Sequence, residues 1–222
     1  MAGGSFTTIG GQATGNRVAR YSISSGTWSS LGTGTNGNIV YALATLPDGD
    51  VLAGGNFSSL GGVTINRIGR FDFDTQLWSD LGYGTQGGVV EAIQVLPTGD
   101  LIVGGNIPRV AGITVNHIAR YSATTGLWST MNSNFVSTGD RVSGLALAPD
   151  GSVIVGGIFT AGGKNRIGRY HPDTNTWSSL GAGLNGTVRA VAVLPGGDVI
   201  AAGDFTTAGG VPASRIARWN GS

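Results

Sequence analysis

Few side chains in this chain are suited to catalysis, and they are scattered along it. The 222 residues include no cysteine, two histidines and a single glutamate, Glu91. The lack of cysteine excludes disulfides, thiolate metal sites and cysteine nucleophiles, and His117 and His171 do not have metal-ligand spacing. A hydrolase with paired carboxylates would need Glu91 opposite Asp140 or Asp204. The sequence therefore predicts that the protein is not an enzyme and that it holds no metal or cofactor.

Arginine and aromatic residues recur along the chain instead. An arginine followed by an aromatic residue returns every 49 or 50 residues, at Arg20, Arg70, Arg120, Arg169 and Arg218. A tryptophan follows seven residues after the aromatic ring in the first four units, as Trp28, Trp78, Trp128 and Trp177. Because these positions recur regularly along the chain and do not gather in one place, we interpret them as structural. We expect the arginines to hydrogen bond to the recurrent aspartates Asp50, Asp100 and Asp198, or to nearby carbonyl groups.

Each repeat unit contains four short segments that are typical of β-strands. In the second unit these are residues 39–46, 50–57, 66–72 and 77–81, with a looser segment at 58–65. Pro-x-Gly turns such as Pro47-Asp48-Gly49 separate the first two strands. No segment shows a helical period, and strands at this spacing indicate an all-β fold. A repeat of this length in an all-β chain predicts a β-propeller of four-stranded antiparallel blades.

The residues that carry these repeats resemble a known family. The runs Asn165-Arg166-Ile167-Gly168-Arg169-Tyr170, Trp177-Ser178-Ser179-Leu180-Gly181 and Leu194-Pro195-Gly196-Gly197-Asp198 are similar to kelch-like propeller repeats. Repeats of that kind occur in bacterial surface proteins and in fungal cortical cell-polarity marker proteins. The resemblance implies a binding or scaffolding role. It also implies no galactose-oxidase chemistry, which needs a cysteine joined to a tyrosine.

The number of blades depends on how the two ends are placed. The sequence divides into a partial blade at 1–37, blades at 38–87, 88–140 and 141–186, and a partial blade at 187–222, all within one domain 1–222. Five blades are favoured; merging the two ends would give four. A third alternative is an open array that a neighbouring chain completes, as a homo-oligomer or a filament, because unfinished sheet edges invite pairing.

One rim of the predicted propeller varies between repeats while the scaffold stays constant. The start of each innermost strand and the longer loops, between the second and third strands and between units, fall on the same face. The equivalent channel-mouth positions carry different residue types, namely Tyr41, Glu91, Ser143 and Arg189. Variable side chains on a rigid scaffold are typical of a binding surface.

The loop at residues 132–141 departs most from the repeat. Phe135 and Asn134 lie in it, and Arg109 lies in the neighbouring loop. These three residues could supply a stacking ring and polar groups for a sugar or a peptide. The competing interpretation is that Phe135 packs beneath its own loop.

Composition narrows the possible partners. The net charge is +1 and charged residues make up 11% of the chain, which gives no electrostatic reason to expect nucleic acid as a partner. No apolar run is long enough to span a membrane. We expect a scaffold that binds a protein or glycan ligand, with a carbohydrate-binding propeller and a head-to-tail surface filament as alternatives. An extracellular or cell-surface location fits this low charge.

Overall fold

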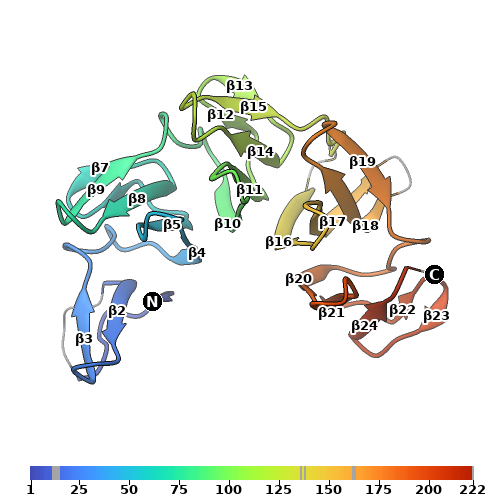
Figure 1. The fold of residues 1–222 in the computed structure, drawn as a ribbon, viewed down its shortest axis with the longest axis horizontal. Coiled ribbons are helices and arrows are strands. Elements are labelled where there is room, and N and C mark those ends of the chain that lie inside the picture. Colours follow the sequence, from blue (N-terminus) through green and yellow to red (C-terminus); the bar gives the residue numbers. More distant parts are fainter. Residues whose placement is uncertain (12–15, 136, 138, 162–163, 222) are drawn as a thin grey trace.

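The computed structural model describes residues 1–11, 16–135, 137, 139–161 and 164–221. Within these residues every regular element is a β-strand, as predicted. The strands form five radially arranged sheets, each a propeller blade, that follow one another along an open arc (Figure 1). The first and last sheets lie apart at the two ends of the arc, so the ends do not merge into a fourth blade. No helix in the described part of the chain is long and apolar enough to cross a membrane.

The three central sheets are complete and antiparallel, with strands in chain order from the concave side of the arc outward. The second sheet contains β4 (Val40–Thr45), β5 (Val51–Gly55), β8 (Ile68–Asp72) and β9 (Leu77–Asp80). The third contains β10 (Val89–Val95), β11 (Leu101–Asn106), β14 (Ile118–Tyr121) and β15 (Trp128–Thr130). The fourth contains β16 (Arg141–Leu147), β17 (Val153–Ala161), β18 (Lys164–His171) and β19 (Thr176–Ser179).

The two end sheets have three strands each. Among the described residues, the first contains β1 (Ala2–Gly3), β2 (Val18–Ser22) and β3 (Thr27–Ser30), which correspond to the second, third and fourth strands of a complete sheet. The last contains β20 (Val188–Val193), β21 (Val199–Gly203) and β24 (Ile216–Trp219), which correspond to the first, second and third.

Three of the segments predicted to be loose contain a small two-stranded ribbon. The ribbons are β6 (Ser59–Leu60) with β7 (Val63–Thr64), β12 (Arg109–Val110) with β13 (Ile113–Thr114), and β22 (Thr207–Ala208) with β23 (Val211–Pro212). Each ribbon also bridges to the loop that precedes its own sheet, as in the pair Thr85–Val110. The ribbons therefore link neighbouring sheets.

Tryptophans join each central sheet to the one before it. The indole N–H groups of Trp78, Trp128 and Trp177 donate to main-chain carbonyls of Leu31, Leu81 and Met131, over 2.9, 3.0 and 2.6 Å. Each acceptor follows the outermost strand of the preceding sheet. Each ring also packs on the aromatic residue opposite it in its own sheet; the Phe71 and Trp78 centroids, for example, are 5.1 Å apart. The repeat spacing thus places a buried hydrogen bond and an aromatic pair at each junction.

The recurrent arginines contact aspartates in the turn between the two innermost strands of their own sheet. Arg70 donates to Asp50 over 2.7 Å, and Arg120 donates to Asp100 over 2.9 and 2.7 Å. Arg218 pairs with Asp198 in the same way. The fourth sheet has Ser152 instead of this aspartate.

The two remaining arginines of the series have other contacts. Arg169 reaches Asp150 over 3.2 Å, in the turn of its own sheet. In the first sheet, which lacks the turn, the guanidinium of Arg20 lies 5.0 Å from the ring centre of Phe73 in the next sheet.

Candidate functional site

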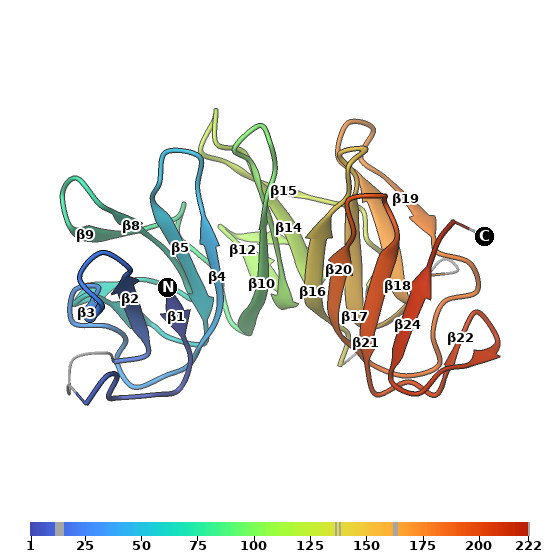
Figure 2. The same cartoon turned by 60° about the horizontal axis from the view of Figure 1, so that its bottom comes forward.

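The four predicted channel-mouth residues come from four different sheets and line one hollow on the concave side of the arc. Tyr41, Glu91, Ser143 and Arg189 lie on β4, β10, β16 and β20, which are the innermost strands. Val89, Asn106 and Arg141 complete the lining, and the hollow has a volume of about 470 Å³. We call it the inner-rim hollow. Figure 2 shows β10, β16 and β20 side by side along this surface.

All four residues occupy the same irregularity in their strands. The pairing register shifts between Val40 and Ala42, and at the corresponding positions of β10, β16 and β20, so that one residue is inserted each time. The inserted residues are Tyr41, Glu91, Ser143 and Arg189. A β-bulge of this kind redirects a side chain that regular pleating would place elsewhere.

Paired small residues on the second strand of each sheet make room for the bulge. A methyl group on Gly105 would lie 2.0 Å from the carbonyl oxygen of Val89, in the bulged strand of its own sheet. A methyl group on Gly104 would lie 2.4 Å from Cγ1 of Val142, in the next sheet. The Gly-Gly pair thus permits both the bulge and the close approach of adjacent sheets.

Polar contacts fix three of the hollow's side chains. The hydroxyl of Ser143 donates to Oε2 of Glu91 over 2.9 Å, which joins the third and fourth sheets across the hollow. Arg189 forms an ion pair of 2.6 Å with Asp204, at the end of the neighbouring strand. Their hydrogen bond lowers the pKa of Asp204 and raises the pKa of Arg189. Both side chains therefore stay charged over a wide pH range.

Two other side chains of the hollow remain available. Tyr41 is 50% exposed. Arg141 has neither a hydrogen bond nor an ion pair among the described residues, and its Nε is buried. Sequence analysis did not predict Arg141 as a site residue, but it lines the hollow together with Ser143 of the same strand. A free guanidinium beside a carboxylate and an exposed phenol can hold a ligand with acidic and hydroxyl groups.

The other predicted ligand contacts lie outside the hollow. Asn134 and Arg109 are exposed, and Arg109 donates to the Gly112 carbonyl over 2.9 Å. Phe135 is fully buried and stacks on Phe159, with ring centres 4.1 Å apart. The prediction that Phe135 offers a stacking ring to a ligand is therefore wrong for this structure.

The burial of Phe135 has a local cause. From Gly157 to Arg166 the chain takes nine residues, whereas the equivalent segment, for example Gly105 to His117, takes twelve. In the described residues of this shorter segment β17 and β18 pair directly, Thr160 with Asn165 and Ala161 with Lys164, where the other sheets have a separate ribbon. Phe135 is part of the buried cluster that includes Phe159 of the fourth sheet. In the third sheet, ribbon residues such as Val110 are part of the corresponding buried cluster.

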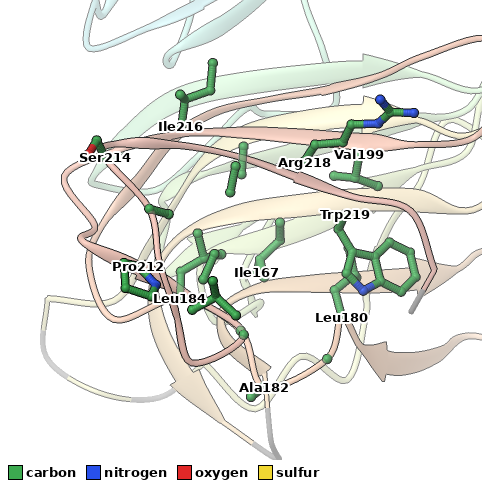
Figure 3. Close-up of a pocket in the computed structure, with 18 residues that line it drawn as sticks. Ile167, Leu180, Ala182, Leu184, Val199, Pro212, Ser214, Ile216, Arg218 and Trp219 are labelled. Atoms are coloured by element: carbon green, nitrogen blue, oxygen red, sulfur yellow. The ribbon is translucent and has the colours of Figure 1, made fainter.

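A second hollow lies at the far end of the arc, against the last sheet. It has a volume of about 680 Å³ and a mostly apolar lining that includes Ile167, Leu180, Leu184 and Trp219. Figure 3 shows Leu180 and Trp219 next to one another in this lining. We call it the end-sheet hollow; the sequence did not predict it as a site.

Two families of known proteins match parts of the sequence. Residues 39–148 match the Rax2 C-terminal beta propeller domain. Residues 148–173 and 195–221 match a beta-propeller domain of unknown function, DUF5122. No curated protein is similar enough to the chain to count as a relative. These matches support propeller repeats over most of the chain, but they do not single out kelch-like repeats.

Solved structures with a similar fold are distant in sequence. The extracellular domain of BT4673 from B. thetaiotaomicron is 14% identical, with a TM-score of 0.62; the alignment covers 90% of this chain and 24% of that one. The chain therefore spans about a quarter of that domain. XC5397 from Xanthomonas campestris, a gluconolactonase, is 16% identical over 90% of this chain and 68% of that one, with a TM-score of 0.56.

The gluconolactonase likeness corrects one prediction. The sequence predicts a protein without enzymatic activity, but propellers of similar fold include gluconolactonases. The prediction is therefore wrong, because this fold does not exclude catalysis. Sequence identities of 16% show a shared fold and no shared activity. Fold, repeat pattern and sequence matches together establish that the chain is an all-β protein of the β-propeller type.

Proposed function

We propose that the chain is a binding scaffold whose ligand lies in the inner-rim hollow. The observation that carries this proposal is that four β-bulges, equivalent by repeat, direct four different side chains into one hollow. A position that only builds the scaffold, the second residue of the small-residue pair, is glycine in every unit, at Gly4, Gly55, Gly105, Gly157 and Gly203. The hollow's volume of about 470 Å³ lies within the usual range for small-ligand sites.

The lining favours a glycan ligand that carries an acidic group. The free guanidinium of Arg141 suits a carboxylate, and the carboxylate of Glu91 can accept hydrogen bonds from hydroxyl groups. The half-exposed ring of Tyr41 offers an apolar face to a sugar ring. An extracellular location accords with such a ligand and with the BT4673 domain, which is extracellular.

Glycan binding tests this proposal. The full chain is screened against arrayed neutral and uronic-acid oligosaccharides, and binders are measured by calorimetry. Arg141→Gln and Tyr41→Ala should each weaken binding at least about tenfold. Arg109→Gln, which removes the same charge outside the hollow, should leave binding unchanged. Failure to bind any glycan, or equal loss in the Arg109 variant, would rule the proposal out.

A second candidate function is head-to-tail assembly of copies. Ile216 is 62% exposed on the last sheet, whereas the equivalent Ile68 and Ile118 are fully buried against a following sheet. Tyr21 is 43% exposed on the first sheet, whereas the equivalent Phe71 is 1% exposed against a preceding sheet. At each internal junction, the isoleucine face of one sheet packs against the aromatic face of the next. The last sheet exposes a face of the first kind and the first sheet a face of the second kind, so the two could pack between copies.

Mass photometry tests the assembly. The chain should form oligomers of increasing length with concentration, and Tyr21→Glu and Ile216→Glu should each be monomeric. Mixing the two variants should give a one-to-one dimer, because each retains one intact face. A monomeric parent chain at high concentration would eliminate this candidate.

A further inference from the structure

A third hollow lies between the second and third sheets, at the opposite end of their strands from the inner rim. Its volume is about 270 Å³. Both sheets that form it have four strands, so it lies at an internal junction of the arc. We call it the junction hollow. Its lining includes Leu46, Asp48 and Arg70 of the second sheet, and Leu101, Tyr121 and Ala123 of the third.

The hollow lies beside a repeat position at which the third sheet has an unusually small residue. Ala123 is equivalent to Phe73 in the second sheet and to Pro172 in the fourth. The main chain follows the same course at the first two positions. The N–H of Phe73 donates to Asp50 over 3.1 Å, and the N–H of Ala123 donates to the equivalent Asp100 over 2.9 Å. The second and third sheets therefore differ here in the side chain alone.

In the second sheet, the ring at this position lies between an aromatic residue and an arginine. Phe73 packs edge-on against Phe71, with ring centres 5.1 Å apart and an interplanar angle of 79°. The guanidinium of Arg20, in the preceding sheet, lies 5.0 Å from the ring centre of Phe73. The equivalents of Phe71 and Arg20 at the junction hollow are Tyr121 and Arg70, and both line it. The hollow thus offers both contacts of an aromatic ring.

Apolar surface is more open at this junction than at the next one. Leu46 and Tyr121 are only partly buried where they pack against the core of the third sheet. Their equivalents between the third and fourth sheets, Leu96 and Tyr170, are 4% and 1% exposed. An added apolar group in the junction hollow would therefore cover surface that the repeat buries elsewhere.

The guanidinium of Arg70 is held in position beside the hollow. It donates hydrogen bonds to Asp50 over 2.7 Å and to Asp48 over 2.8 Å, both in its own sheet. At the next junction, Arg120 instead also donates to the carbonyl of Pro172 in the following sheet, over 3.0 Å. The side chain of Arg70 stays 39% exposed. A guanidinium within about 6 Å of a ring centre attracts the face of an aromatic ring.

From these observations we propose that the junction hollow is a binding site for a single uncharged aromatic ring, carried by a free small molecule or by a phenylalanine side chain of a partner. The ring packs edge-on against Tyr121, with its face toward Arg70, as Phe73 does one sheet earlier. Leu46 and Leu101 supply the apolar remainder of the lining. A cavity of about 150 Å³ suffices for benzene, so the volume admits one ring.

An NMR titration of the full chain tests the proposal. Benzyl alcohol represents a free aromatic ligand, and N-acetyl-phenylalanine amide represents a phenylalanine side chain. Benzyl alcohol should bind saturably with a dissociation constant of about 0.1 to 1 mM. Signals of Leu46, Leu101 and Tyr121 should shift, whereas those of the inner rim should not. Binding of both probes would assign the site to a partner's side chain, and binding of benzyl alcohol alone would assign it to a small molecule.

A matched probe tests whether the site requires an aromatic ring. Cyclohexylmethanol has the same connectivity as benzyl alcohol but no π system. It should bind at least about threefold more weakly, because it cannot attract the guanidinium of Arg70. Equal binding of the two alcohols, or the absence of saturable binding by either aromatic probe, would overturn the proposal.

Two variants with matched controls locate the ring. Ala123→Phe supplies the ring that the second sheet has, and it should weaken binding of benzyl alcohol at least about tenfold by filling the hollow. Thr124→Phe adds a ring one residue later in the same exposed turn, outside the lining, and should have no effect.

Arg70→Gln should weaken binding about threefold. Arg218→Gln breaks the equivalent ion pair with Asp198 in the last sheet and should leave binding unchanged. Unchanged binding in both Ala123→Phe and Arg70→Gln, or signal shifts confined to the end-sheet hollow, would contradict the assignment. The outcome is independent of glycan binding, because the inner-rim hollow lies at the other end of the strands.

Discussion

The α-carbon of Gly105 lies so close to the carbonyl oxygen of Val89 that a methyl group added to it would be 2.0 Å from that oxygen. This contact ties the second strand of the sheet to the bulge that presents Glu91. Gly55, Gly157 and Gly203 show the same relation to their bulged strands, at 2.0 or 2.1 Å. The glycine therefore couples the scaffold to the direction of the inner-rim side chains.

Gly105→Ala should destabilise the protein, because the methyl group must displace the main chain of the bulge. We expect a loss of about 1 to 3 kcal/mol in the free energy of unfolding, measured by chemical denaturation. Gly196→Ala is the matched control, since a methyl group there has no atom within 4 Å and φ is not positive. It should change stability by less than about 0.5 kcal/mol. Equal effects at the two sites would contradict the role given to Gly105.

Trp128→Phe should cost more stability than Trp28→Phe. The indole of Trp128 donates to the buried carbonyl of Leu81, whereas that of Trp28 has no partner among the described residues. Loss of the indole donor leaves the Leu81 carbonyl with one hydrogen bond, from the Gly84 N–H over 3.1 Å, so we expect a cost of about 0.5 to 1.5 kcal/mol. Denaturation midpoints of both variants provide the comparison. A larger loss for Trp28→Phe would mean that the hydrogen bond at the junction contributes little.

Phe135→Ala should destabilise the fourth sheet by about 3 to 5 kcal/mol, because it removes a fully buried ring and leaves a cavity. The change is measured by urea denaturation. Ile23→Ala is the control for an exposed apolar residue, since Ile23 is 91% exposed. A stable Phe135→Ala protein with impaired ligand binding would restore the interpretation of Phe135 as a ligand contact.

His117 should make the protein less stable as the pH falls. Burial lowers the pKa of His117 from its usual 6.5, partly opposed by Asp140. The unfolded chain therefore takes up this proton first as the pH drops below 6.5, and stability is lost as the pH falls through the folded-state pKa. His117→Asn should flatten the dependence of unfolding free energy on pH between about 5 and 7. His171→Asn is the control, and an unchanged slope in His117→Asn would exclude this histidine as the cause.

Most of the local structure could be predicted from the sequence. Alternating and apolar strand segments, Pro-x-Gly turns and the small-residue pairs are short-range signals, and they return with the repeat of about 50 residues. The same period identified Tyr41, Glu91, Ser143 and Arg189 as equivalent positions, and the structure brings them together. The reason is that equivalent positions on radially arranged sheets must lie at the same height along the common axis.

The features that only the tertiary structure reveals arise from contacts between repeat units. The repeat does not state the angle between adjacent sheets, so it could not distinguish an open arc from a merged four-bladed ring. The burial of Phe135 could not be predicted from residue spacing. It depends on the fourth sheet, where Phe135 packs on Phe159 in the place that ribbon residues take in the third sheet. The end-sheet hollow appears only when Leu180 and Trp219, 39 positions apart in the sequence, are placed against each other. Side-chain patterns fix strands, whereas packing between sheets fixes curvature, burial and the hollows that can bind.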